Sequence, residues 1–168
     1  MQVNGGTLSG GLTLGSRPAG YVYMMDASVA GEVRLIVLAD SVGDGIPNQW
    51  RQQHFGGDGT TTNEDSAAGS DPDGDGADNY HEFVADTDPT NALSYFRIRG
   101  FPHSGSPGVT FLSSTSRLYT LYGADDIRTN GWTNLPSQTD VPGAGTNVLT
   151  DDAGSRTQRY YRVGVQLP

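Results

Sequence analysis

The chain has 168 residues and a mass of 17.8 kDa, which is enough for one compact domain or two small ones. Its 24 glycines and 9 prolines favour a folded, turn-rich protein over a long helical bundle. There is no cysteine, which excludes disulfides, thiolate zinc sites and cysteine nucleophiles. No apolar run approaches the ~20 residues that a membrane span needs, so we expect no membrane insertion.

Negative charge is concentrated in the middle of the chain. The formal net charge is −9, and all ten basic residues are arginines. Between Asp40 and Thr90, ten aspartates and two glutamates are opposed by a single arginine, Arg51, so this stretch carries −11. Repulsion among these charges opposes compaction unless a cation neutralises part of them. The same charge argues against nucleic acid or anionic lipid as a partner.

Residues 1–39 form the first of three segments and have the pattern of short strands. The predicted strands are β-branched or aromatic runs bounded by glycine or proline, at 12–14, 20–25 and 33–38. We expect a hairpin connection at 26–31. Three strands are marginal as an independent unit, so this segment is either the end of an upstream domain or part of a C-terminal sandwich.

The second segment, 40–92, is the acidic stretch, and two short helices are predicted in it. The first spans 47–55, with Pro47 in its first turn and Gly56 after its end. The second spans 79–85. The large apolar side chains of this segment are too few for a conventional core: Trp50, Phe55, Tyr80 and Phe83. We therefore expect the segment to depend on a metal ion for its stability.

The third segment, 93–168, returns to strands separated by connections rich in glycine, serine, aspartate and proline. Strands are predicted at 95–101, 109–112, 118–122, 132–135, 147–150 and 159–166. In the last of these, one face is predicted to carry Tyr161, Val163, Val165 and Leu167. The spacing predicts a small antiparallel β-sandwich. The expected fold class is mainly β, with antiparallel sandwich parts joined by the acidic segment and its two short helices.

The residues from Asp71 to Glu82 match the spacing of an EF-hand-like calcium loop, D-x-[DN]-x-[DN]-G-x5-E, without a mismatch. Calcium takes six to eight oxygen ligands, and such a loop supplies them from positions 1, 3, 5, 7, 9 and 12. Gly76 allows the sharp turn at position 6. Magnesium fits less well because it keeps several of its waters. The predicted cofactor is Ca²⁺, and its predicted ligands are Asp71, Asp73, Asp75, the carbonyl of Ala77, Asn79 and Glu82.

The segment from Asp71 to Pro89, with Glu82-Phe83 and Thr87-Asp88-Pro89 behind the loop, resembles the thrombospondin type 3-like calcium-binding repeats of secreted bacterial proteins. The segment before the loop is a poor helix, so a true EF-hand is not expected. The third segment is similar to the small β-sandwich module that ends many such chains. The resemblance implies a secreted or cell-surface location, as a piece of a larger exported bacterial chain. It also implies that calcium is bound by Asp71, Asp73, Asp75, Asn79 and Glu82.

The stretch from Asp40 to Arg51 resembles the opening half of the same repeat but departs from its ligand pattern. Asp40 and Asp44 stand at loop positions 1 and 5. Val42 replaces an acidic residue at position 3, and Arg51 replaces the closing glutamate at position 12. Three interpretations stay open. A second calcium ion binds here, Asp40 or Asp44 completes the site of the other loop, or Arg51 pairs with surplus carboxylates.

The sequence carries no catalytic motif of the common kinds: it has no G-x-S-x-G elbow, no H-E-x-x-H and no phosphate-binding loop. We therefore expect a non-catalytic module, a structural or adhesion spacer in which calcium rigidifies the connection between the β parts. The alternative is a carbohydrate-binding module that holds a polysaccharide or cell-surface glycan. Its aromatic stacking residues would be Trp132, Tyr119, Tyr122 and Tyr160.

Overall fold

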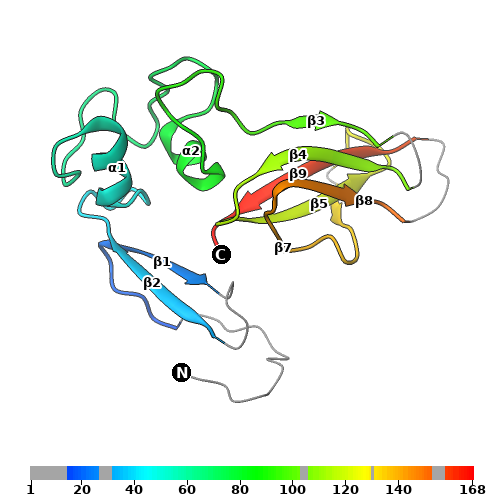
Figure 1. Cartoon of the computed structure of the whole chain (residues 1–168), viewed down its shortest axis with the longest axis horizontal. Helices are drawn as coiled ribbons and strands as arrows, with labels where there is room; N and C mark the ends of the chain where they lie inside the picture. The colour runs from blue at the N-terminus through cyan, green and yellow to red at the C-terminus, as the bar shows by residue number, and fades with distance from the viewer. Residues whose placement is uncertain (1–14, 27–31, 103–105, 130, 153–157) are drawn as a thin grey trace. The chain divides into compact units, whose positions relative to one another are not determined.

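The computed structural model describes residues 15–26, 32–102, 106–129, 131–152 and 158–168. It confirms a mainly β fold with antiparallel sheets and two helices (Figure 1). The chain divides into two compact units. Unit 1 runs to Phe83 and also contains Asp88–Leu93 and Pro168, and unit 2 consists of Val84–Thr87 and Ser94–Leu167.

Unit 1 contains an antiparallel hairpin of β1 (Tyr21–Asp26) and β2 (Arg34–Ala39), which confirms two of the strands predicted in the first segment. This hairpin belongs to the same unit as the acidic stretch. After β2, the N–H of Asp40 donates to the carbonyl of Gly20 at 2.8 Å. The predicted strand at 12–14 and most of the predicted hairpin connection lie outside the described residues.

Helices α1 (Asn48–Phe55) and α2 (Asn79–Ala85) lie where the sequence predicts them. Pro47 precedes α1 with φ −63° and ψ 144°, so the residue without an N–H stands where no helical hydrogen bond is lost. Gly56 ends α1 with φ +76°, and its N–H donates to the carbonyl of Gln52 at 2.9 Å. Neither helix of the described chain is long and apolar enough to cross a membrane.

Unit 2 is a small antiparallel β-sandwich. One sheet has the order β3–β4–β8, formed by Ile98–Gly100, Gly108–Ser113 and Gly145–Thr150. The other sheet is built on β5 (Leu118–Ala124), which pairs along its length with β9 (Tyr160–Gln166). Two short strands also pair with β5, and these are β6 (Thr133–Asn134) and β7 (Val141–Pro142).

The clearest differences from the sequence prediction in unit 2 are at β3 and β7. The strand predicted at 95–101 is shorter in the structure, and its register against β4 shifts at an irregularity between Ile98 and Gly100. The sequence does not predict β7, since Pro142 cannot donate to a ladder and is unusual inside a strand. The pairing of β7 with β5 covers only two residue pairs.

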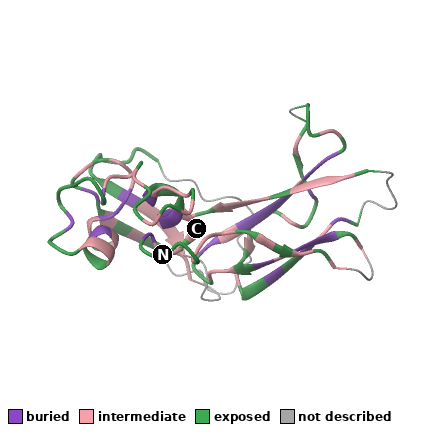
Figure 2. Ribbon diagram, turned by 90° about the horizontal axis from the view of Figure 1, so that it is seen from above, coloured by how far each residue is buried: buried purple, intermediate pink, exposed green. Residues whose placement is uncertain are grey.

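The two sheets of unit 2 enclose an apolar core. Its buried members are Val109, Phe111, Tyr119, Leu121, Leu135 and Leu149. Along β9, Tyr161, Val163 and Val165 pack against this cluster, which confirms the predicted alternation for these residues. Figure 2 shows buried positions in purple interspersed along the strands. Each fully buried apolar side chain contributes about 1.5–3 kcal/mol, so unit 2 has a conventional core of its own.

Unit 1 has much less buried apolar surface. Among its described residues, the buried hydrophobic side chains are those of Val22, Ile46 and Phe83. Pro47 and Pro89 are also buried in this unit, and its buried polar or charged side chains include Asp40, Arg51, Asn79 and Glu82. A unit built this way depends on how well its buried polar groups are paired.

Candidate metal centre

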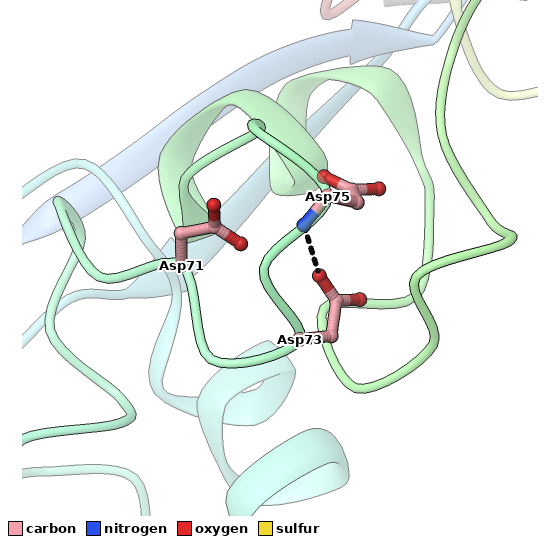
Figure 3. Close-up of side chains that lie close together, drawn as sticks. All are labelled: Asp71, Asp73 and Asp75. Atoms are coloured by element: carbon pink, nitrogen blue, oxygen red, sulfur yellow. Dashed lines mark hydrogen bonds between the residues drawn. The ribbon is translucent and has the colours of Figure 1, made fainter.

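Three aspartates gather in the loop that leads into α2. The carboxylates of Asp71, Asp73 and Asp75 each offer an oxygen, and these oxygens all lie within 4.8 Å of one another (Figure 3). Oxygens bound to one calcium ion at 2.3–2.6 Å lie at most about 5 Å apart. The three side chains are therefore close enough to share a single ion.

The backbone of this loop is held by its own carboxylates. Asp71 accepts hydrogen bonds from the N–H groups of Gly74 at 2.9 Å and Gly76 at 3.0 Å. Asp75 accepts one from the N–H of Ala77 at 2.8 Å. Both glycines have positive φ, +76° and +97°, a conformation that residues with a Cβ rarely adopt. The alternation of aspartate and glycine in the sequence thus folds the loop around its acidic side chains.

Asp73, Asp75 and Asn79 each have a buried side-chain oxygen that accepts no hydrogen bond from any residue that the structure describes. These oxygens are Oδ2 of Asp73, Oδ2 of Asp75 and Oδ1 of Asn79. A buried acceptor without a partner costs about 1–3 kcal/mol, so native structures rarely leave several together. The three atoms stand at positions 3, 5 and 9 of the predicted calcium loop, where its ligands are expected.

Asn79 is fully buried at the start of α2. Its Nδ2 donates to the carbonyl oxygens of Asp65 and Ala67, both at 2.7 Å. These two bonds fix the planar amide, so Oδ1 points away from the 65–67 segment. Asn79 therefore presents its oxygen as a fixed group rather than as a mobile surface side chain.

Glu82 stands at loop position 12, one turn into α2, and its side chain is fully buried. The group of oxygens within 4.8 Å of one another does not include Glu82, which has other interactions of its own. A buried carboxylate is costly unless it is hydrogen-bonded or near a cation. Its burial thus fits the role of the closing ligand, although the structure does not bring it as close as the three aspartates.

The electrostatics of the loop disfavour the ionised form of Asp73 in the absence of a cation. Burial raises the pKa of Asp73, and the charges of Asp75 and Asp71 raise it further. A bound divalent ion would reverse this effect, because it favours the charged form of every carboxylate around it. The donor set consists of hard oxygens alone, which suits calcium or magnesium rather than zinc or copper.

The two other acidic residues predicted as metal ligands, Asp40 and Asp44, lie in the loop between β2 and α1. Asp40 is buried and accepts from the N–H groups of Gly43 and Gly45 at 2.8 and 2.9 Å. Asp44 forms an ion pair with Arg51 at 2.8 Å. Neither joins the cluster of Asp71, Asp73 and Asp75 within the described chain. Of the three interpretations left open by the sequence, the pairing of Arg51 with a carboxylate is the contact that the structure contains.

The four aromatic residues predicted to stack on a sugar are not equivalent in the structure. Tyr119 is 1% exposed in the core of unit 2, and its hydroxyl accepts from the N–H of Ser114 at 2.8 Å. The prediction is wrong for Tyr119, because a buried ring offers no face to a ligand. Tyr160 is half-buried, and its hydroxyl accepts from Nε2 of Gln158 at 2.6 Å.

Trp132 and Tyr122 are both half-buried and both contact Arg162. The guanidinium carbon of Arg162 lies 4.8 Å from the ring centroid of Tyr122 and 4.9 Å from that of Trp132. The arginine therefore covers one face of each ring.

Comparisons of the chain with protein-family models, with curated proteins and with solved structures find no match.

Proposed function

We propose that the loop from Asp71 to Glu82 binds one calcium ion and that this ion stabilises unit 1. The observation that carries the proposal is the set of three buried oxygens of Asp73, Asp75 and Asn79 that accept no hydrogen bond from the described residues. A cation is the partner that all three oxygens lack. The −11 charge of the acidic stretch supports the same conclusion, because it leaves a large surplus of carboxylates.

Calcium fits the loop better than magnesium does. The motif offers up to seven oxygens, if Glu82 binds through both of its own and Ala77 contributes its carbonyl. Calcium accepts six to eight oxygens in variable geometry, whereas magnesium requires a tighter octahedron and gives up its waters reluctantly. Burial of Asn79 and Glu82 leaves little room for a retained water shell on that side.

The proposed role is structural rather than catalytic. The proposed ligands at positions 9 and 12 lie on α2. The residues of this helix up to Phe83 belong to unit 1, and its last residues belong to unit 2. Calcium bound at the start of α2 would order the helix through which the chain passes from one unit to the next. The resemblance to thrombospondin type 3-like repeats of secreted bacterial proteins supports a spacer or adhesion module of an exported chain.

Thermal unfolding in EDTA, calcium and magnesium tests the proposal. If the dissociation constant is about 10⁻⁴ M, calcium at 10 mM stabilises unit 1 by about 2.7 kcal/mol. That corresponds to a rise in Tm on the order of 10 °C for a unit of this size. We expect no comparable rise with the same concentration of magnesium.

Two variants make the test specific to the loop. Glu82→Gln removes the closing carboxylate and should abolish most of the calcium-dependent rise in Tm. Asp58→Asn removes the same charge from an exposed residue of unit 1 and should keep the rise. If calcium fails to raise the Tm of the natural chain, and metal analysis of the purified protein finds no bound ion, the calcium proposal is wrong.

A further inference from the structure

Unit 1 contains the calcium-loop backbone twice. The first loop is Asp40–Arg51 and the second loop is Asp71–Glu82, with equivalent residues 31 positions apart in the sequence. In each loop the position 1 aspartate accepts from the N–H groups at positions 4 and 6, at 2.8 and 2.9 Å in the first and at 2.9 and 3.0 Å in the second. The two loops are therefore structural repeats, although their ligand residues differ.

The glycines of the two loops confirm the equivalence. Gly43 and Gly74 occupy position 4 with φ of +80° and +76°. Gly45 and Gly76 occupy position 6 with φ of +89° and +97°. Because the backbone is the same, the oxygens that face a cation in one loop have counterparts in the other. What differs is the group that those oxygens contact.

In the first loop, the guanidinium of Arg51 contacts the oxygens of positions 5 and 7. Arg51 is 1% exposed, and its Nη2 donates to both carboxylate oxygens of Asp44 at 2.8 Å. Its Nη1 donates to the carbonyl of Ile46 at 3.4 Å. The position 5 carboxylate and the position 7 carbonyl are among the groups that bind the ion in a calcium loop. The arginine thus takes up the oxygens that a cation would otherwise hold.

The two loops also differ in what the side-chain oxygen at position 9 contacts. In the first loop, Oδ1 of Asn48 accepts from the N–H of Ser41 at 2.9 Å. In the second loop, Oδ1 of Asn79 has no donor among the described residues. At position 3 the first loop has Val42, which offers no side-chain oxygen at all. At position 9 the first loop satisfies its side-chain oxygen internally, whereas the second loop leaves it without a donor among the described residues.

Arg51 also ties the first loop to the segment that leads toward the second. Its Nε donates to the carbonyl of Ser66 at 3.1 Å, and its Nη1 donates to the carbonyl of Gly59 at 3.3 Å. Arginine suits this position because its planar guanidinium has five donors in a fixed geometry. A lysine has the positive charge but lacks the several separated N–H donors that contact Asp44, Ile46 and Ser66 together.

We propose that Arg51 is the internal cation of the first loop, so that this loop is ordered without metal and unit 1 binds its ion in the second loop alone. The statement about the second loop rests on the proposed calcium function. The role of Arg51 in the first loop does not rest on it. It follows that the first loop is a latent metal site. Val42→Asp together with Arg51→Glu would supply the missing carboxylates at positions 3 and 12 and remove the guanidinium.

The test is a calcium titration of the natural chain and of the Val42→Asp/Arg51→Glu variant. Amide NMR monitors each titration, and metal analysis gives the number of ions bound per chain. The N–H groups of Gly43 and Gly45 report on the first loop, and those of Gly74 and Gly76 on the second. In the natural chain we expect one ion, with shifts at Gly74 and Gly76 and none at the first loop. In the double variant we expect one further ion, with new shifts at Gly43 and Gly45.

The outcomes separate this inference from the calcium function. Calcium shifts at Gly43 and Gly45 in the natural chain would overturn the inference, because they would place an ion in the first loop. If no glycine shifts in the natural chain but the double variant gains an ion at Gly43 and Gly45, the calcium function of the second loop fails and the inference stands. If the double variant folds but gains no ion, the first loop is not a latent site.

A second variant covers the case in which the double variant fails to fold. Arg51→Met removes the guanidinium but adds no ligand, and Arg34→Met makes the same change at an exposed arginine of unit 1. In EDTA we expect Arg51→Met to broaden or lose the Gly43 and Gly45 signals and Arg34→Met to preserve them. Unchanged Gly43 and Gly45 signals in Arg51→Met would show that the first loop does not need the arginine and would overturn the inference.

Discussion

The indole of Trp50 packs edge-on against the ring of Phe83, with the ring centroids 5.9 Å apart. Trp50 lies in α1 directly before Arg51, and Phe83 lies in α2 directly after Glu82. The helices that follow the two loops are therefore joined through these rings. Edge-to-face aromatic pairs contribute about 0.5–1.5 kcal/mol beyond the area that they bury.

We predict that Phe83→Ala lowers the free energy of unfolding of unit 1 by about 3–5 kcal/mol, because Phe83 is 4% exposed in a unit with few buried apolar side chains. Urea unfolding followed by Trp50 fluorescence measures this loss, in a chain whose other tryptophan is replaced by Trp132→Phe. Leu93→Ala is the control, since Leu93 is 83% exposed in the same unit and should cost less than about 0.5 kcal/mol. Equal losses in the two variants would contradict the assignment of Phe83 to the core of unit 1.

Asp73→Asn should have opposite effects with and without calcium. Burial and the charges of Asp75 and Asp71 raise the pKa of Asp73, so its ionised form is less stable in the folded chain than in the unfolded one. At neutral pH in EDTA, the neutral asparagine should therefore match or exceed the stability of the natural chain. In 10 mM calcium the variant should lose most of the ~2.7 kcal/mol that bound calcium contributes.

Urea unfolding at pH 7 in both buffers measures this reversal. Glu64→Gln is the charge control, because Glu64 is exposed in the same unit and lies outside both loops. It should shift stability by a similar small amount in EDTA and in calcium. If Asp73→Asn is destabilised equally in both buffers, the side chain has a structural role that is independent of metal.

The sequence predicts the two helices and the calcium motif well because their signals are local. Pro47 and Gly56 delimit α1, and the spacing from Asp71 to Glu82 fixes both the turn of the second loop and the start of α2. The partner of Arg51 could not be chosen from the sequence, because its contacts to Gly59 and Ser66 depend on how the intervening chain folds back. Arg51 nevertheless stands at position 12 of the first loop, where the second loop has Glu82, and this equivalence in the sequence indicated that Arg51 has a role in the loop.

The environment of Asn79 also depends on contacts that no motif encodes. Its amide is held by carbonyls of Asp65 and Ala67, 14 and 12 residues earlier in the chain. In β5, apolar and aromatic residues occupy both faces of the strand, so the sequence did not show which tyrosine is buried. The pairing of β5 with β9 places Tyr119 in the core and leaves Tyr122 against Arg162.

Unit 2 should respond to loss of a buried ion pair in a way that does not depend on calcium. Arg159 bonds to Asp151 through Nε and to Asp125 through Nη1, both at 3.0 Å, and Asp151 is 5% exposed. We predict that Arg159→Met costs about 3–5 kcal/mol, because it removes the guanidinium that pairs with the buried carboxylate of Asp151. The loss should be the same in EDTA and in calcium.

The matched control is Arg128→Met, which removes the surface pair of Arg128 with Asp126. Arg128 is 85% exposed, so the change should cost no more than about 1 kcal/mol. Chemical unfolding followed by the fluorescence of Trp132, in a chain carrying Trp50→Phe, reports on unit 2 in both cases. A calcium-dependent loss in Arg159→Met would contradict the prediction that the stability of unit 2 does not depend on calcium.

The last prediction concerns Trp132 and the possibility of a glycan ligand. Trp132 is half-buried, lies outside the core cluster of unit 2 and has one ring face covered by Arg162. We therefore expect Trp132→Ala to leave unit 2 folded, with a loss of about 1 kcal/mol from the cation–π contact and its packing. Arg162→Ala should uncover the same face, and acrylamide should then quench Trp132 more strongly.

Titration with soluble polysaccharides decides whether that face also binds sugar. A stacked glycan would shift the emission of Trp132 in the natural chain, and the shift should grow in Arg162→Ala, because the arginine no longer competes for the ring. Retention on a glycan gel that disappears in Trp132→Ala, while the variant keeps its Tm, would add carbohydrate binding to the calcium function. Unfolding of Trp132→Ala would instead show that the indole is a structural part of the sandwich, since an exposed stacking residue is not needed for the fold.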